Sequence, residues 1–73
     1  YSVQLGAFSE RAHADKLVAR MRSLGLEPVV LGNSADGLYR VRVRGLKSEA
    51  EVRQVEQLLR RHRIEYHVIK PGG

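Results

Sequence analysis

The fold of this protein is decided by residues 38–45, Leu-Tyr-Arg-Val-Arg-Val-Arg-Gly. Charged and apolar residues alternate within this stretch, with Arg40, Arg42 and Arg44 set against Tyr39, Val41 and Val43. Because successive side chains of a strand point to opposite faces, the alternation predicts a strand over 38–44 with one buried and one exposed face. Three like charges on one face repel one another. The pattern therefore indicates either an anion-binding face or a solvated face that keeps its charges in water.

The length and charge of the chain limit what it can be. Its 73 residues form one small domain, which buries only about 60% of its unfolded surface and leaves little room for a deep active site. A formal net charge of +5 favours an anionic partner, and the absence of cysteine excludes disulfides and thiolate chemistry. No apolar run approaches the roughly 20 residues of a membrane-spanning helix. We expect a domain over residues 1–70, excised from a longer protein, with a tail over 71–73.

A strand and a helix are predicted ahead of residue 27. Alternation over residues 1–6 predicts a strand that turns Tyr1, Val3 and Leu5 inward and Ser2, Gln4 and Gly6 outward. Ser9 is the expected N-cap of a helix over 10–24, because a serine side chain can accept a hydrogen bond from the first helical turn. Gly25 is expected to end this helix in the left-handed backbone conformation.

A hairpin is predicted next. A short strand over 27–31 is expected at a sheet edge, because Pro28 cannot donate a ladder hydrogen bond. The turn-rich residues 32–37 join it to the strand over 38–44.

A second helix and a fourth strand complete the chain. Ser48 and Glu51 have the spacing of a capping box, which predicts a helix that begins there and ends near Arg63. Residues 65–70 alternate again, which predicts a strand with Tyr66 facing inward and His67 facing outward.

The predicted order of elements, βαββαβ, defines an α+β fold of the ferredoxin or RNP-like type. Right-handed crossovers place the first and third strands in the centre of a four-stranded antiparallel sheet. Each helix has one apolar stripe, so both helices cover the same sheet face. We call the uncovered face the open face. It is expected to carry Ser2, Gln4, Leu38, Arg40, Arg42, Arg44, His67 and Ile69.

Three segments of the chain, in this order, resemble those of SPOR domains (sporulation-related repeat): residues 1–9, Tyr-Ser-Val-Gln-Leu-Gly-Ala-Phe-Ser; residues 37–43, Gly-Leu-Tyr-Arg-Val-Arg-Val; and the helix start Ser-Glu-Ala-Glu at 48–51. The resemblance covers nearly the whole chain. It implies a non-catalytic module that binds peptidoglycan and recognises denuded glycan strands, from which amidases have removed the stem peptides. It further implies a bacterial envelope protein, periplasmic or extracytoplasmic, that this module targets to the division septum.

The resemblance also implies a binding site on the open face. The family positions correspond to Gln4, Ala7, Leu38, Arg40 and His67, and the alternation of the third strand adds Arg42 and Arg44. The chain departs from the family pattern at two of these positions. Leu38 stands where some members have Trp, and Arg44 stands where the family usually turns with Gly.

A physical reason connects arginine with such a ligand. Amidase cleavage leaves a free lactyl carboxylate on each muramic acid, so a denuded strand is a polyanion. Arginine binds carboxylates in a bidentate manner, and the amide of Gln4 can both donate to and accept from acetamido groups. A stem peptide converts the carboxylate to an amide and adds bulk, so peptide-bearing strands should be rejected.

Two other functions remain open at this point. An RRM-like module that binds single-stranded nucleic acid has the same topology, but it stacks bases on aromatic residues of the central strands. The outward positions of those strands here include no aromatic residue, and the RNP1 pattern is absent, so we expect no nucleic-acid partner. A protein–protein interaction module that uses the open face or a sheet edge is the third alternative.

Catalysis is not expected. No carboxylate pair or Ser-His-Asp arrangement stands out, and the three histidines lack metal-ligand spacing. We therefore expect no catalytic residue, no metal and no cofactor, and a monomeric domain that does not itself contact the membrane.

Overall fold

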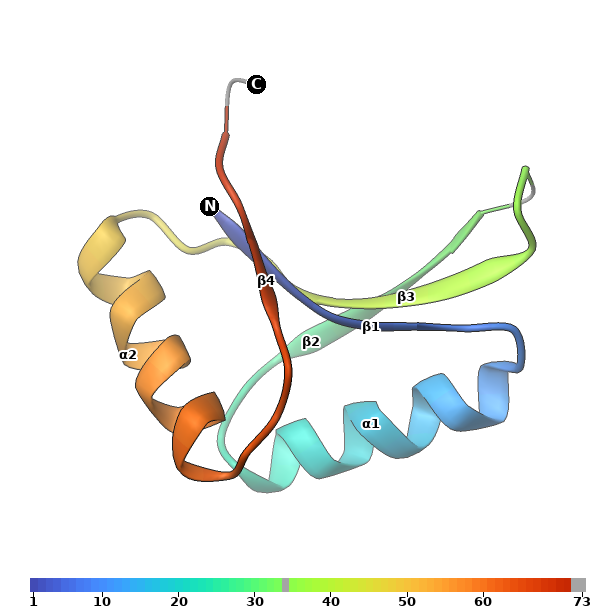
Figure 1. Ribbon diagram of the computed structural model, residues 1–73, viewed down its shortest axis with the longest axis horizontal. Coiled ribbons are helices and arrows are strands. Elements are labelled where there is room, and N and C mark those ends of the chain that lie inside the picture. The colour runs from blue at the N-terminus through green and yellow to red at the C-terminus, as the bar shows by residue number, and fades with distance from the viewer. Residues whose placement is uncertain (34, 72–73) are drawn as a thin grey trace.

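The protein folds as two helices against a four-stranded antiparallel sheet (Figure 1). The structure, a computed structural model, describes residues 1–33 and 35–71; residue 34 of the expected turn and residues 72–73 of the expected tail lie outside the described residues. The elements are β1 (Ser2–Phe8), α1 (Arg11–Ser23), β2 (Pro28–Asn33), β3 (Leu38–Val43), α2 (Glu49–Arg61) and β4 (His67–Ile69). The sheet order is β2-β3-β1-β4, which confirms the predicted fold class, the central pair and the edge position of Pro28.

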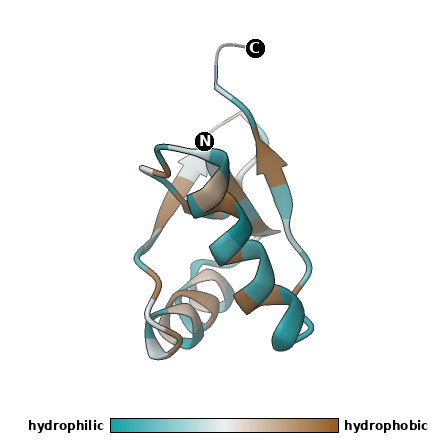
Figure 2. Cartoon of the chain, turned by 90° about the vertical axis from the view of Figure 1, so that its left-hand side faces the viewer, coloured by the Kyte–Doolittle hydropathy of each residue, from teal (hydrophilic) through white to brown (hydrophobic). Residues whose placement is uncertain are grey.

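Both helices pack into one core on the same side of the sheet. In Figure 1, α1 runs beneath the central strands and α2 lies beyond β4. Figure 2 shows hydrophobic residues separated by hydrophilic ones along the helices, as expected of helices with one buried stripe. The buried core consists of Val3, Leu5, Ala14, Val18, Met21, Val41, Val43, Val52, Val55 and Leu59. Within the described residues, no helix or strand covers the other face of the sheet, as predicted.

A β-bulge in β1 changes which residues face outward. Gln4 pairs with Arg42, but the next pair along the ladder is Gly6 with Val41, so one extra residue is inserted between them. Gly6 therefore lies opposite a buried valine, and its predicted outward position is wrong. Ala7 instead faces outward, opposite Arg40. A Cβ on Gly6 would lie 3.1 Å from the ring of Phe8, so the absence of a side chain suits this position.

The start of α1 also differs from the prediction. Its N-cap is Glu10, whose side chain makes no capping hydrogen bond, so the assignment of Ser9 is wrong. The reason is that β1 continues through Phe8, two residues beyond the expected strand end, and this moves the turn into the helix along the chain. At the other end, Gly25 has φ of +89°, which confirms its predicted left-handed conformation.

The other element ends lie close to their predicted positions. The strands β3 and β4 are shorter than expected and stop before Arg44 and Lys70, and α2 ends at Arg61 rather than near Arg63. Ser48 is confirmed as the N-cap of α2, since its Oγ accepts a hydrogen bond from the Glu51 N–H at 3.3 Å. The Glu51 carboxylate accepts from the N–H of Lys47, one residue before the N-cap.

Replacement of Ser48 by alanine is expected to lower the free energy of unfolding by about 1 kcal/mol, because a backbone N–H in the first turn of α2 loses its acceptor. Urea unfolding followed by circular dichroism measures this change. Ser9→Ala is the matched control, and we expect it to change the free energy of unfolding by no more than a few tenths of a kcal/mol. Equal losses for both variants would contradict the assignment of the cap to Ser48.

Candidate functional site

The open face carries polar and cationic side chains on its central strands. The strand register gives its residues: Val29 and Leu31 on β2, Leu38, Arg40 and Arg42 on β3, Ser2, Gln4 and Ala7 on β1, and His67 and Ile69 on β4. On β2, β3 and β4 these residues alternate with residues that face the helices, and on β1 the bulge places two such residues, Leu5 and Gly6, between Gln4 and Ala7. Because the face is built on the two central strands, its side chains start from the most rigid part of a small fold.

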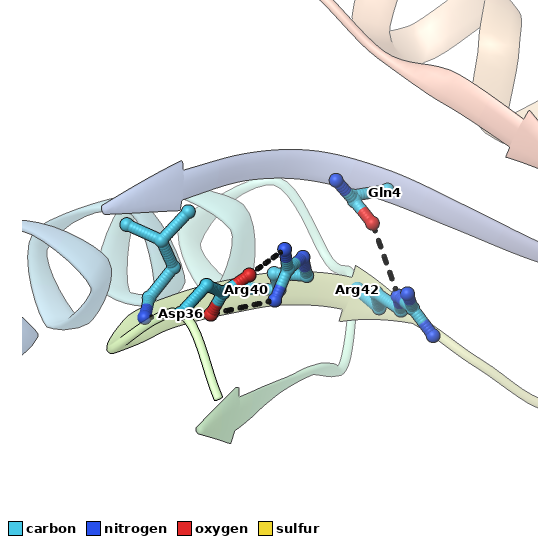
Figure 3. Close-up of polar contacts among 5 residues, drawn as sticks. Gln4, Asp36, Arg40 and Arg42 are labelled. Atoms are coloured by element: carbon cyan, nitrogen blue, oxygen red, sulfur yellow. Dashed lines mark hydrogen bonds and ion pairs between the residues drawn. The ribbon is translucent and has the colours of Figure 1, made fainter. Parts of the chain in front are cut away.

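Arg42 and Gln4 form the centre of this face. They are cross-strand partners, and Arg42 Nε donates a hydrogen bond to Gln4 Oε1 at 3.3 Å (Figure 3). His67 pairs with Gln4 on the far side, so the three residues form one row across β3, β1 and β4. Gln4 orients the guanidinium of Arg42 through Nε. The Nη1 and Nη2 groups of Arg42 take no part in that bond, and they are the pair of donors that binds a carboxylate end-on.

Arg40 differs from Arg42 because it is paired with a carboxylate of the protein itself. Its Nη2 lies 2.5 Å from Asp36 Oδ2, and its Nη1 donates to Asp36 Oδ1 at 3.5 Å (Figure 3). Asp36 belongs to the turn between β2 and β3, and its Oδ1 also accepts the N–H of Leu38 at 3.0 Å. The Arg40 side chain is only 24% exposed. Its positive charge is therefore compensated in the free domain.

The ion pair shifts the pKa values of both of its members. The hydrogen bond from Arg40 is the main cause that lowers the pKa of Asp36, with the backbone N–H of Leu38 the second. The same hydrogen bond raises the pKa of Arg40. The ion pair is thus present throughout the neutral range. The ion pair is lost only when Asp36 is protonated, which requires a pH below the ordinary pKa of an aspartate.

The remaining residues of the predicted site occupy different places. Ala7 is exposed and lies opposite Arg40 on the neighbouring strand. Leu38 is half-buried and lies two residues before Arg40 on the same face of β3. His67 is exposed at the first position of β4. Arg44 is exposed but lies beyond the end of β3, so the structure does not bring it into the ladder rows that hold Arg40 and Arg42.

Two residues of the open face and one residue of the adjoining turn were missed from the sequence. Val29 and Leu31 lie opposite Arg42 and Arg40 on β2, and Val29 is 38% exposed. Their place depends on the register of β2 against β3, which the alternation of β3 alone does not give. Asp36 is the third, and the signal that could have found it is a carboxylate four residues before Arg40 in a turn that enters the same strand.

The described residues 1–33 and 35–71 contain no cluster of three or more His, Cys, Asp or Glu residues that could hold a metal ion. Within the same part of the chain, neither helix has the length and apolar character needed to cross a bilayer.

Comparison with known families matches residues 1–70 to the SPOR domain. The chain belongs to the SPOR domain family. A comparison with curated proteins returned no match.

Two solved structures have the same architecture. The first is the crystal structure of the RlpA SPOR domain from Pseudomonas aeruginosa, with a TM-score of 0.83 and 22% sequence identity over 96% of this chain and 97% of that one. The second is the solution structure of the peptidoglycan binding domain of the B. subtilis cell wall lytic enzyme CwlC. Its TM-score is 0.80, with 28% identity over 93% of this chain and 84% of that one. Both matches cover more than nine-tenths of this chain.

The aromatic residues of the two central strands lie on the side of the SPOR fold that faces the helices. Phe8 and Tyr39 are cross-strand partners, and both pack against the core. In the part of the chain that the structure describes, these strands therefore offer no aromatic side chain to a base on the open face. The geometry gives no support to the RRM-like alternative.

Proposed function

We propose that this SPOR domain is a non-catalytic module that binds peptidoglycan through the open face, with denuded glycan strands as its preferred ligand. Through this binding it would carry the protein of which it is part to the division septum of a bacterial cell, outside the cytoplasm. Two findings support the proposal: the membership of the SPOR family, and the 28% identity with a domain described as peptidoglycan-binding. The unit that binds is residues 1–70.

The hydrogen bond between Arg42 and Gln4 is the observation on which the proposal rests. It holds a guanidinium on the open face through Nε, and the two terminal nitrogens, which take no part in this bond, would bind a carboxylate. The lactyl carboxylate of a denuded muramic acid is such a group, and a bidentate charge-assisted contact is about twice as strong as a neutral one. The amide nitrogen of Gln4 can donate to the same ligand, because only its oxygen is used by Arg42.

Arg42 would also disfavour glycan strands that carry stem peptides. The peptide is attached through the lactyl carboxyl group, so a peptide-bearing strand has a neutral amide where the denuded strand has a negative charge. Arg42 would then lose its charged partner, and the peptide would have to lie over a flat sheet face. The two effects act in the same direction.

The domain is expected to bind amidase-treated sacculi several-fold more than untreated sacculi, because only the treated material exposes free lactyl carboxylates. Co-sedimentation of the purified domain with both preparations, at equal mass of sacculi and at two salt concentrations, measures the difference. The variant Arg53→Ala tests whether any lost positive charge changes this difference, and we expect it to bind both preparations as the wild type does. Arg53 is exposed on α2 and pairs only weakly with Glu49, at 3.8 Å. Equal binding to both preparations would contradict the proposed preference for denuded strands.

A further inference from the structure

The two arginines in the centre of the open face are not chemically equivalent. Arg42 is held by a neutral amide and forms no ion pair with a carboxylate of the described residues, whereas Arg40 is held by the carboxylate of Asp36 at 2.5 Å. We propose that Asp36 and Arg40 form a second subsite for the uncharged part of the glycan, its hydroxyl and acetamido groups, while Arg42 binds the carboxylate. This inference rests on the proposed function of the open face.

Charge balance argues against Arg40 as a carboxylate site. A ligand carboxylate that bound Arg40 would have to displace Asp36, and this replaces one carboxylate by another with little net gain. Asp36 is also held in place by the N–H of Leu38 at 3.0 Å. A displaced Asp36 would thus stay close to the incoming group and repel it, because like charges in a shared site are unfavourable.

The hydrogen-bonding capacity of the pair suits a hydroxyl group instead. The bonds to Asp36 use two of the five N–H groups of a guanidinium, and each carboxylate oxygen has two acceptor positions. The described contacts of the pair therefore leave donors on Arg40 and an acceptor on Asp36. A sugar hydroxyl both donates and accepts, and an acetamido group does the same through its N–H and C=O. An anion, in contrast, can use only the donors.

Apolar side chains border the pair, as expected for a site that takes a sugar ring. Leu31 lies opposite Arg40 on β2, and Leu38 is two residues before Arg40 on the same strand face. Both leucines are half-buried, and the Arg40 side chain itself is mostly covered. A few fixed polar groups among apolar ones are the usual composition of a small-ligand site, where C–H surfaces of the ligand cover the apolar part.

The substitution Asp36→Asn distinguishes this subsite from a simple cationic surface. Asparagine keeps an oxygen for the Leu38 N–H, so the turn is retained, but the ion pair with Arg40 is lost. The net charge of the domain rises by one, which by electrostatics alone would tighten binding to an anionic glycan. The subsite predicts the opposite, a three- to tenfold weakening, roughly that of one or two lost hydrogen bonds.

The test is an NMR titration of the wild-type domain, Asp36→Asn and Asp15→Asn with two probes: denuded glycan and an uncharged oligomer of N-acetylglucosamine. Asp15 is the matched control, because it forms an exposed ion pair with Arg11 at 3.8 Å on α1, away from the open face. We expect Asp36→Asn to bind both probes more weakly than the wild type, and Asp15→Asn to bind both with unchanged affinity. We also expect the uncharged oligomer to shift the amides of residues 36–40 in the wild type.

Tighter binding of denuded glycan by Asp36→Asn would show that Asp36 competes with the ligand, and would overturn the subsite. An uncharged oligomer that leaves the amides of residues 36–40 unshifted would overturn it as well. In either case binding of denuded glycan by the wild-type domain would leave the proposed function intact. Failure of the wild type to bind denuded glycan would instead remove the proposed function, and the subsite with it.

Discussion

Replacement of Arg42 by alanine is expected to weaken binding of denuded glycan by about 1.5–3 kcal/mol, the range for a hydrogen bond to a charged group, which is roughly a ten- to hundredfold rise in Kd. The structure singles out Arg42 because, among the residues it describes, no carboxylate forms an ion pair with this side chain. Its guanidinium is also oriented by Gln4 at 3.3 Å, so little side-chain freedom is lost when a carboxylate binds.

Isothermal titration calorimetry at two salt concentrations tests this expectation. The variant should also show a weaker dependence of Kd on salt than the wild type, because one charge–charge contact has been removed. Arg53→Ala removes the same charge from α2 and should change Kd by less than twofold, and Arg42→Lys should recover only part of the affinity, since lysine has no bidentate fork. A loss of the same size in Arg53→Ala and Arg42→Ala would mean that only net charge matters.

The sequence sufficed for the architecture because the signals were local and independent. Alternation in 38–44, the glycine after the first helix and the capping box at Ser48 each depend on near neighbours in the chain. The glycine and the cap were confirmed, and the strand was confirmed over Leu38–Val43. Strand order then followed from the handedness of the two crossovers.

The bulge in β1 could not be predicted from alternation alone. Residues 1–6 alternate without a break, which fits an uninterrupted strand. The irregularity appears only in the pairing of β1 with β3, where Gly6 rather than Leu5 lies opposite Val41. The family resemblance predicts Ala7 as a site residue. The bulge places Ala7 on the open face, and without it Ala7 would face the helices.

The interaction partners of the arginines could not be predicted from the strand pattern either. Alternation assigns Arg40, Arg42 and Arg44 to one face but says nothing of their partners. The differences come from a turn carboxylate, a cross-strand amide and the end of β3, which are contacts with other segments. The three arginines predicted to act alike therefore differ. Arg40 is paired with a carboxylate, Arg42 is oriented by an amide, and Arg44 is exposed outside the strand.

Replacement of Leu59 by alanine is expected to lower the free energy of unfolding by about 2–5 kcal/mol, since Leu59 has no exposed surface and its loss leaves a cavity in the core. A domain of this size is stable by only a few kcal/mol, so this single change removes much of the margin. The thermal midpoint should fall by roughly 10 °C or more.

Differential scanning calorimetry measures this midpoint, with Gln57→Ala on the same helix as the control because Gln57 is exposed. The two variants also separate stability from recognition. The helix α2 lies on the far side of the sheet from the open face, so at a temperature where Leu59→Ala is still folded its Kd for denuded glycan should match that of the wild type. A raised Kd in the folded variant would mean that the position of α2 controls the open face, whereas an unchanged Kd assigns recognition to the sheet alone.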